Sequence, residues 1–221
     1  MDIEQARFNM VEQQIRTWEV LDQSVLDLLL AVKREDFVPT AYRALAFVDM
    51  EIPLGEGQTM MAPKLEARLI QELALKAHER VLEIGTGSGY LTALLAKRTA
   101  KVASIEYFES LATSAAARIA VAGIDNVEIT VGDAAQSPAN FVDATQTFDV
   151  IVFTGSLPVL PTVYLNHLAV GGRLFAVVGD APAMKATLFT KTRENTTTEQ
   201  ALFETVLPPL INAEQPSRFT F

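Results

Sequence analysis

The feature that most constrains the fold is a short apolar run that breaks into a glycine-rich turn. Residues 81–84 are mostly apolar, and glycines follow at alternate positions, Gly85, Gly87 and Gly89. A helix-forming segment comes next. A buried strand that turns in this way into a helix brings backbone N–H groups against a nucleotide-like ligand. The turn therefore predicts an α/β fold with a ligand at the carboxyl end of the strand.

The spacing of the glycines indicates which nucleotide-like ligand the turn binds. A dinucleotide fingerprint has glycines at the first, third and sixth positions, whereas the sixth position here is Tyr90. The pattern Glu-x-Gly-x-Gly-x-Gly is typical of S-adenosylmethionine (SAM) methyltransferases. SAM has no pyrophosphate, but its cationic amino group and sulfonium favour nearby carboxylates. The SAM-binding residues expected in this motif are Glu83, Gly85, Thr86, Gly87, Ser88 and Gly89.

From Arg80 onward, short aliphatic runs alternate with helical stretches. This alternation predicts a doubly wound, mostly parallel, Rossmann-like α/β sheet. Two further strands separated only by polar residues predict an antiparallel C-terminal hairpin, which makes seven strands in all. The predicted strands are Arg80–Ile84, Lys101–Glu106, Val127–Val131, Phe148–Phe153, Arg173–Val178, Ala186–Thr192 and Ala201–Val206, with helices at 90–97, 108–122 and 161–169.

The N-terminal third predicts a helical cap. Its segments are helices at 3–16, 22–34 and 64–75, loops and short helices over 36–53, and a glycine-flanked loop at 55–63. Asp22 is placed to cap the second helix. At 221 residues the chain is long for one domain and short for two, given about 150 residues per domain. We expect one domain, with residues 1–78 as the cap and 79–221 as the core.

Polar residues at strand ends predict the rest of the cofactor site, because ligands of open α/β sheets bind beyond the carboxyl ends of the strands. Glu106 ends the second strand, where an acid accepts from ribose hydroxyls. Asp133 and Ala134 follow the third strand, at the position of the adenine, and Thr154 follows the fourth, at the methyl-transfer cleft. Alternatives remain: Glu106 as a solvated strand end, Asp133 as a helix cap, and Glu83 as a structural acid.

Composition excludes several classes of protein. The chain has no cysteine, which rules out disulfide scaffolds, cysteine nucleophiles and thiolate metal sites. Its two histidines are isolated, and we expect surface or structural roles for them and no metal site. The net charge is −9 without a basic stripe, so we expect no nucleic-acid partner. No apolar run approaches a bilayer span and the first residues are acidic, which favours a cytoplasmic protein without a membrane partner.

The segment Pro53–Thr59, followed at this distance by the glycine turn, resembles the protein-L-isoaspartate O-methyltransferase family. That family carries Gly-x-Gly-Gln-Thr-aliphatic-Ser-x-Pro ahead of Glu-Ile-Gly-Thr-Gly-Ser-Gly-Tyr. Further segments match it in order, and the similarity runs from about residue 20 to 180. These segments are Arg34–Pro39, Ser104–Glu106, Phe148–Ile151 and Gly171–Leu174.

The resemblance implies methyl transfer from SAM to the α-carboxylate of an isoaspartyl residue in a damaged protein or peptide. That carboxylate is already ionised at pH 7, since carboxyl pKa values lie near about 4. A strong general base is therefore unnecessary, and catalysis depends on aligning the carboxylate with the methyl group.

The chain departs from the family on the acceptor side. The loop serine is replaced by Met61, which has no hydroxyl to donate, while Thr59 is kept. The end of the fourth strand and the segment 205–210 also differ, and Pro208 lacks an N–H. Three readings stay open. The chain is an isoaspartyl methyltransferase that uses Thr59 and backbone donors, a paralogue with an apolar acceptor pocket, or a catalytically weak SAM-binding protein.

Overall fold

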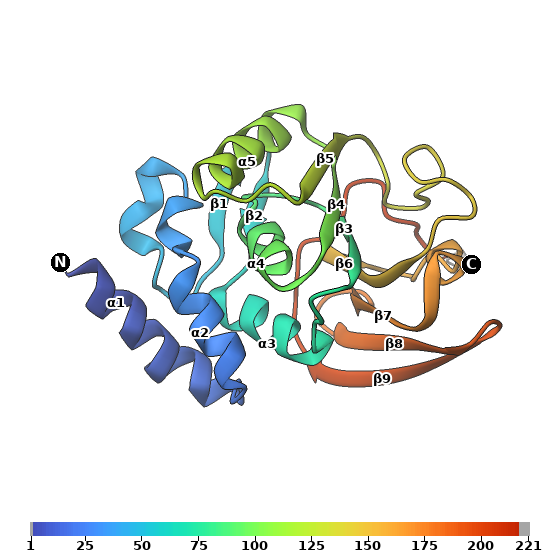
Figure 1. Ribbon diagram of the computed structural model, residues 1–221, viewed down its shortest axis with the longest axis horizontal. Helices are drawn as coiled ribbons and strands as arrows, with labels where there is room; N and C mark the ends of the chain where they lie inside the picture. Colours follow the sequence, from blue (N-terminus) through green and yellow to red (C-terminus); the bar gives the residue numbers. More distant parts are fainter. Residues whose placement is uncertain (1, 217–221) are drawn as a thin grey trace, which may run out of the picture.

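The computed structural model describes residues 2–216, and its centre is a seven-stranded sheet in the order β5-β4-β3-β6-β7-β8-β9 (Figure 1). The strands are β3 (Arg80–Ile84), β4 (Lys101–Glu106), β5 (Val127–Val131), β6 (Phe148–Leu157), β7 (Leu168–Val178), β8 (Lys185–Arg193) and β9 (Thr196–Glu204). Strands β3 to β7 are parallel to one another. Strand β8 is antiparallel to β7, and β9 is antiparallel to β8. The predicted fold class is confirmed.

Apolar side chains on the central strands alternate between two cores, as residues of a sheet covered on both faces must. Val81 and Val150 point into the larger core, whereas Leu82 and Ile151 point into the smaller one. These side chains are fully buried. The register pairs Ile84 with residues of both neighbouring strands, so the strands on either side of β3 reach the same edge of the sheet.

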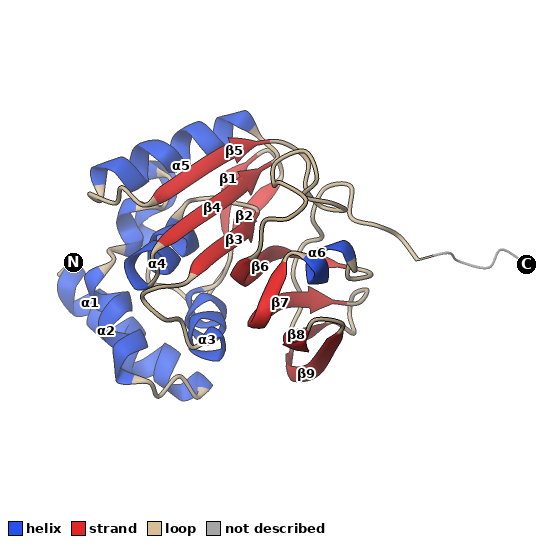
Figure 2. Cartoon of the chain, turned by 45° about the vertical axis from the view of Figure 1, so that its right-hand side comes forward, coloured by secondary structure: helices blue, strands red, loops and turns tan. Residues whose placement is uncertain are grey.

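Helices cover the two faces unequally (Figure 2). The larger core lies under α2 (Gln23–Ala31), α3 (Pro63–Leu73), α4 (Tyr90–Arg98) and α5 (Glu109–Val121). The other face carries α6 (Val163–Asn166) and irregular chain from the β5–β6 connection. The sheet therefore has a thick helical layer on one side and a thin cover on the other.

The N-terminal cap is helical as predicted, but the second predicted helix ends at Ala31 and the third at Leu73. The first helical run begins as α1 (Ile3–Asn9), continues as a π-helix over Met10–Ile15 and ends as a 3₁₀ turn at Arg16–Trp18. Asp22 caps α2, because its carboxylate accepts the Ser24 N–H at 2.8 Å. Short 3₁₀ helices follow at Arg34–Asp36 and Thr40–Leu45.

The predicted loop over 55–63 is wrong in its first half, which is a hairpin. Strand β1 (Ile52–Gly55) pairs with β2 (Gln58–Met60). Glu56 and Gly57 lie between them with φ of +52° and +71°, as the central residues of a tight hairpin turn require. The glycine pair was the sequence signal for this turn.

Several further boundaries differ from prediction. Strand β6 continues to Leu157, so Thr154 lies within it and not after it, and β7 begins at Leu168 and not at Arg173. The last strand begins at Thr196 and not at Ala201, because the β-branched residues at 196–198 extend it as a polar edge strand. The helix expected over 161–169 is only four residues long, since Leu168 already pairs with Phe148 as part of the sheet.

After β9 the chain returns to the carboxyl end of β6. The Ser156 N–H donates to the Pro208 carbonyl at 2.9 Å, and the Leu210 N–H donates to the Ser156 carbonyl at 3.0 Å. Residues 207–211 thus run beside β6 and form one isolated parallel bridge, between Ser156 and Pro209, although Pro208 itself has no N–H to offer.

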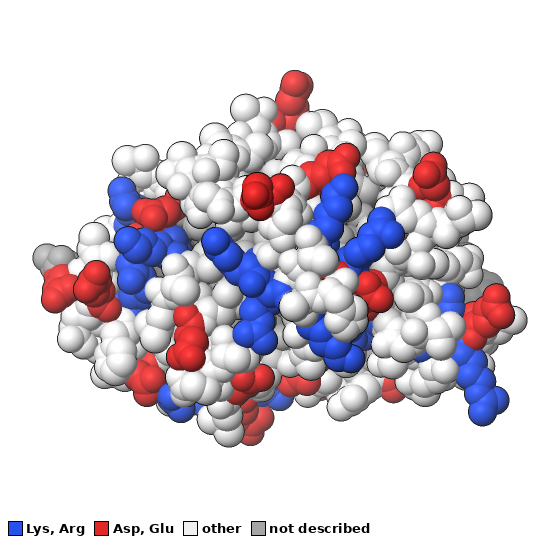
Figure 3. All heavy atoms as spheres, viewed as in Figure 1, with Lys and Arg blue, Asp and Glu red and all other residues white. Residues whose placement is uncertain are grey.

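The outer surface carries charges of both signs. Figure 3 shows basic and acidic side chains intermingled over one face of the molecule. Within residues 2–216, no helix has the length and apolar character needed to cross a membrane.

Candidate active site

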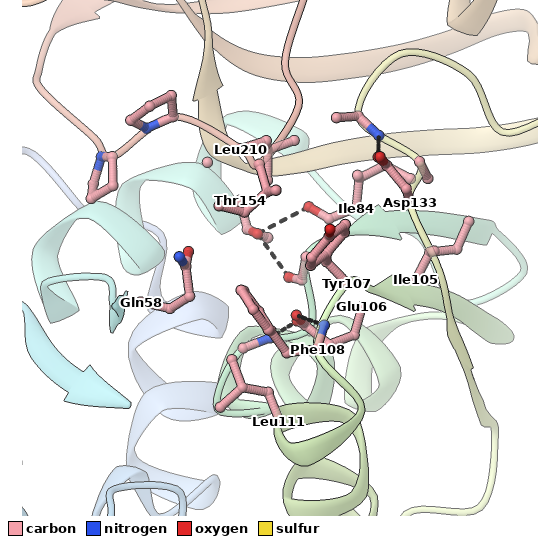
Figure 4. A pocket seen from close by; sticks show the side chains of 18 of the residues that line it. Gln58, Ile84, Ile105, Glu106, Tyr107, Phe108, Leu111, Asp133, Thr154 and Leu210 are labelled. Atoms are coloured by element: carbon pink, nitrogen blue, oxygen red, sulfur yellow. Dashed lines mark hydrogen bonds between the residues drawn. The ribbon is translucent and has the colours of Figure 1, made fainter. Parts of the chain in front are cut away.

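An open pocket lies at the carboxyl ends of the parallel strands (Figure 4). It is walled by the β1–β2 hairpin, the glycine turn after β3, the ends of β4 and β6, the chain after β5 and residues 207–211. Of the predicted site residues it brings together Thr59, Met61, Gly85, Gly87, Glu106, Asp133, Ala134 and Thr154. A smaller cavity of about 300 Å³ beside it adds Thr86 and Ser88. Glu83 and Gly89 line neither cavity.

The glycine turn is held tightly against β4 and β6. Gly85 has φ of +97°, and its N–H donates to the Ile105 carbonyl at 2.8 Å. A Cβ at Gly85 would lie 2.2 Å from the Thr154 hydroxyl oxygen. That hydroxyl lies 2.7 Å from the Gly85 carbonyl and 3.0 Å from the Ile84 carbonyl. Only glycine fits here, because both the backbone angle and the space exclude a side chain.

Two later residues of the turn, Ser88 and Gly89, form its junction with the helices. Gly89 has φ of +84°, and a Cβ there would lie 3.1 Å from Cβ of Ala115 in α5. The Ser88 hydroxyl accepts the Tyr90 N–H at 3.2 Å, at the first residue of α4. Both residues therefore join the turn to α4 and α5, and neither lines the larger pocket.

Glu106 is buried at the end of β4, with 4% of its surface exposed, so its reading as a solvated strand end is wrong. Its carboxylate accepts the Gly87 N–H at 2.8 Å and the Phe108 N–H at 3.0 Å. These two bonds fix the carboxylate between the glycine turn and the start of α5. It lines the larger pocket, where it is available to accept hydrogen bonds from hydroxyl groups.

Asp133 is exposed at the far wall, where its carboxylate accepts the Ala135 N–H at 3.2 Å and the Asn212 side-chain amide at 2.7 Å. The described chain has no helix between β5 and β6, so the helix-cap reading is wrong. The neighbouring Ala134 is buried, and its carbonyl accepts a hydrogen bond from the Tyr164 hydroxyl.

Glu83 lies beneath the turn and is fully buried. One carboxylate oxygen accepts from the hydroxyls of Thr92 and Ser104, each at 2.6 Å. The other oxygen has no partner among the described residues. Burial raises the pKa of this carboxyl to about 8, against the two hydroxyl bonds that lower it. The Ser104 hydroxyl lies 2.6 Å from that of Thr86, so Glu83 reaches the turn through a chain of hydroxyls.

The acceptor hairpin is held from the N-terminal cap. Arg34 is fully buried and donates to the Met61 carbonyl at 2.7 Å and to the Ala46 carbonyl at 3.0 Å. It also pairs with the buried carboxylate of Glu66, and its guanidinium lies 5.1 Å from the ring centre of Tyr90. Burial raises the pKa of Glu66 to about 7, and the neighbouring Arg34 opposes this shift.

The two predicted acceptor-side residues differ in exposure and in contacts. The Thr59 hydroxyl donates to the Glu51 carboxylate at 3.0 Å. The side chain of Met61 is buried and belongs to the larger core, although it also lines both cavities. Neither side chain directs a free hydroxyl proton into the pocket in this arrangement.

Sequence reasoning missed several lining residues. Gln58 lies on the hairpin and faces the pocket, with Tyr107, Phe108 and Leu210 on other walls (Figure 4). Gln58 and Tyr107 directly adjoin residues that were predicted, which was the available signal. Leu210 reaches the pocket because the chain returns along β6, and the available signal was the family resemblance that places the segment 205–210 on the acceptor side.

The two histidines take no part in the site. His167 is buried, with its Nδ1 2.9 Å from the Gln146 carbonyl, and His78 is exposed. The structural role predicted for His167 is confirmed. In the part of the chain that the structure describes, no cluster of three metal-binding side chains occurs.

Comparison with known proteins agrees with this geometry. Residues 5–215 match the family model for protein-L-isoaspartate(D-aspartate) O-methyltransferase. A protein-L-isoaspartate O-methyltransferase of Roseiflexus castenholzii is 38% identical over 96% of this chain and 94% of its own length. One of Methanoculleus marisnigri is 40% identical over 78% of this chain and 77% of its own.

Solved structures show the same fold. A putative protein-L-isoaspartate O-methyltransferase of Plasmodium falciparum, in complex with S-adenosyl-L-homocysteine, superposes with a TM-score of 0.81 at 22% identity. The match covers 93% of this chain and 98% of that one. With a family model that spans nearly the whole sequence, the chain belongs to the protein-L-isoaspartate (D-aspartate) O-methyltransferase family.

Proposed function

We propose that this chain is a SAM-dependent O-methyltransferase that methylates the free carboxylate of isoaspartyl or D-aspartyl residues in damaged proteins and peptides. The observation that carries the proposal is one shared pocket. Glu106 and Asp133 line one side of it, and the family's acceptor loop, with Gln58 and Thr59, lines the other. Cofactor and acceptor groups thus meet in a single space.

The residues present fit SAM. The open pocket joins the glycine turn, the end of β4 and the chain after β5, which is where small-molecule sites of α/β sheets lie. Gly85 and Gly155 stand where a Cβ would meet Thr154 and Leu210, so the backbone comes close to the cavity only because side chains are missing. In the proposal, Glu106 binds the ribose, Asp133 and Ala134 flank the adenine, and the turn from Gly85 supports the amino-acid part. Glu83 positions the turn from below.

Bound SAM supplies an electrophilic methyl group on a sulfonium. The protein's own task is to align the acceptor carboxylate, which is ionised at neutral pH and needs no proton removed. Met61 and residues 207–211 supply mostly apolar walls beside the acceptor side. Arg34 fixes the hairpin backbone through the Met61 carbonyl, and Thr154 fixes the glycine turn. Both loops are thereby pre-organised before the substrate binds.

Transfer of labelled methyl from SAM to an isoaspartyl peptide tests the proposal. We expect base-labile label on the isoaspartyl peptide and none on the peptide that contains ordinary aspartate. SAM binding without transfer to the isoaspartyl peptide would overturn it. The proposal includes a cytoplasmic location, which rests on composition alone, and a substrate that is a protein or peptide and not a nucleic acid.

A second acceptor class has one observation in its favour. Met61 replaces a hydroxyl and the Thr59 proton is directed to Glu51, so the hairpin offers fewer side-chain donors to a carboxylate. A paralogue with an acceptor of lower charge would show transfer to proteins without isoaspartyl sites. Treating protein substrates with an authentic isoaspartyl methyltransferase beforehand distinguishes the two, because only isoaspartyl acceptors are then blocked.

A further inference from the structure

The acceptor wall of the pocket lacks the hydroxyl donors that its sequence suggests. Three side chains of the hairpin segment line it: Gln58, Thr59 and Met61. Methionine has no proton to donate, and a threonine hydroxyl has only one. The Thr59 proton is engaged with Glu51 at 3.0 Å, which leaves the threonine oxygen as an acceptor toward the pocket.

Gln58 is the third side chain of this wall, and its amide can donate hydrogen bonds. The amide nitrogen carries two protons, and within the described chain its partner is the Glu56 carbonyl at 3.4 Å. That contact is long beside the usual 2.9–3.0 Å. The side chain is half-buried, and Figure 4 shows its amide directed toward the space between the hairpin and the cofactor wall.

The turn that carries Gln58 is anchored in place. Glu56, at its tip, accepts a hydrogen bond at 2.8 Å from the Ser110 hydroxyl of α5. This bond ties the hairpin to the helix that begins just after Glu106 on the cofactor wall. Gln58 therefore sits on a fixed turn, which lowers the entropy lost when its amide binds a ligand.

The other side-chain hydroxyls that line the pocket belong to Thr154, and to Tyr107, which follows Glu106 on the cofactor wall. The Thr154 hydroxyl is committed to the carbonyls of Ile84 and Gly85. Glu106 and Asp133 are carboxylates and repel an anionic acceptor. A carboxylate that enters from the hairpin side needs a donor there, and an amide satisfies it without adding charge.

We propose that Gln58 donates the side-chain hydrogen bond that orients the acceptor carboxylate, in place of the hydroxyl missing at Met61. This inference rests on the proposed function. Gln58 is thus a substrate-binding residue whose amide selects carboxylate acceptors, while Glu51 keeps the Thr59 hydroxyl turned away.

Two near-isosteric variants test the proposal. Gln58→Met removes the donor, and Gln58→Glu replaces it with a like charge. A hydrogen bond to a charged group corresponds to roughly a 10- to 100-fold effect. We expect kcat/KM for the isoaspartyl peptide to fall about that much in Gln58→Met and further in Gln58→Glu, with the affinity for S-adenosyl-L-homocysteine unchanged.

Gln215→Glu is the matched control. Gln215 also donates to a carbonyl two residues before it, at 3.5 Å, and it lies outside the pocket. This control should keep wild-type activity. Equal losses in Gln58→Met and Gln58→Glu would overturn the proposal, because a role only in shaping the turn does not depend on charge. Loss of S-adenosyl-L-homocysteine binding in step with turnover would overturn it as well.

Direct binding separates this proposal from the function on which it rests. Titrating the isoaspartyl peptide into the wild-type complex with S-adenosyl-L-homocysteine measures acceptor binding without turnover. Binding that Gln58→Glu weakens, in a protein that transfers no methyl, supports the role of Gln58 while the proposed function fails. Binding equally strong in both proteins overturns the role of Gln58 even where the wild type is active.

Discussion

The two walls of the pocket are built in different ways. On the cofactor wall, the two acids that line the pocket accept hydrogen bonds from backbone N–H groups, Glu106 from Gly87 and Phe108, and Asp133 from Ala135. On the acceptor wall, the hairpin segment is held by charged side chains that precede it in the N-terminal cap. Arg34 reaches the Met61 carbonyl, and Glu51 receives the Thr59 hydroxyl.

This difference shows where the site is robust and where it can change. Strand ends of a parallel sheet meet at one edge by geometry, so the cofactor wall follows from the fold itself. The acceptor wall depends on a buried ion pair and on a few side-chain bonds, which single substitutions can alter. Divergence at Met61 and over residues 205–210 falls on this second wall. Substitutions in each wall should therefore have separable effects.

The largest effect is expected from Arg34→Met. It removes one partner of a fully buried pair and leaves Glu66 without its cation, which typically costs about 3–5 kcal/mol. It also frees the Met61 carbonyl, so the hairpin loses its anchor. We expect a large fall in Tm and a raised KM for the isoaspartyl peptide, measured by thermal denaturation and steady-state kinetics.

Arg7→Met is the matched control for Arg34. The Arg7–Glu35 pair is also buried, but its hydrogen bonds do not involve the hairpin. Stability should fall in both variants, and the peptide KM should rise only in Arg34→Met. An equal rise of KM in both variants would show that peptide binding depends on the overall stability of the protein. It would then not depend on the hydrogen bond from Arg34 to the Met61 carbonyl.

The next effect concerns the cofactor wall. Gly85→Ala forces a Cβ to within 2.2 Å of the Thr154 hydroxyl oxygen at φ of +97°. Overpacking and left-handed strain together amount to roughly 2–5 kcal/mol. We expect weaker SAM binding, measured by calorimetry. The structure of the β1–β2 hairpin should stay unchanged.

Gly123→Ala separates strain from overlap. Gly123 has φ of +66°, and a Cβ at this position would meet nothing within 4 Å, so this variant carries only the backbone strain. Combining Gly85→Ala with Thr154→Ala should recover part of the lost SAM affinity by removing the overlap. No recovery would mean that the backbone angle alone determines the defect.

A smaller effect is expected from the pH dependence of stability. The Glu83 carboxyl has a pKa of about 8 in the folded protein and an ordinary value of 4.5. Between these values the folded state keeps a proton that the unfolded state has lost. The free energy of unfolding therefore falls as pH rises through this window, by at most about 1.4 kcal/mol per pH unit from this group.

Glu83→Gln should flatten that slope, since glutamine keeps an oxygen for the Thr92 and Ser104 hydroxyls and does not titrate. Urea denaturation at several pH values from 5 to 9 measures it. Glu66 titrates in both proteins, so the difference between the two curves isolates Glu83. Parallel curves would show that Glu83 is ionised in the fold at neutral pH.

The sequence predicted the cofactor wall far better than the acceptor wall, for a physical reason. Strands such as Lys101–Glu106 follow from local apolar patterns, and the acids after them are then placed by the sheet. The position of Leu210 instead depends on a return of the chain to β6, and the direction of the Thr59 hydroxyl depends on Glu51. Contacts between residues distant in the chain leave no periodic signal.

The smallest effect is expected from the hydroxyl that Met61→Ser adds to the acceptor wall, measured on catalysis and not on stability. Met61 is buried in the larger core, so truncating it costs roughly 2–5 kcal/mol of stability by the measure of large-to-small core substitutions. Met61→Ala carries nearly the same loss without a hydroxyl. The ratio of kcat/KM between the serine and alanine variants therefore reports the hydroxyl alone. With Gln58 already donating to the acceptor, a second donor should raise the ratio only a few-fold, within the roughly 0.5–1.5 kcal/mol of an ordinary hydrogen bond. A ratio in the hundreds would show that the acceptor wall lacks a donor altogether, and a ratio of one would show that position 61 does not touch the acceptor.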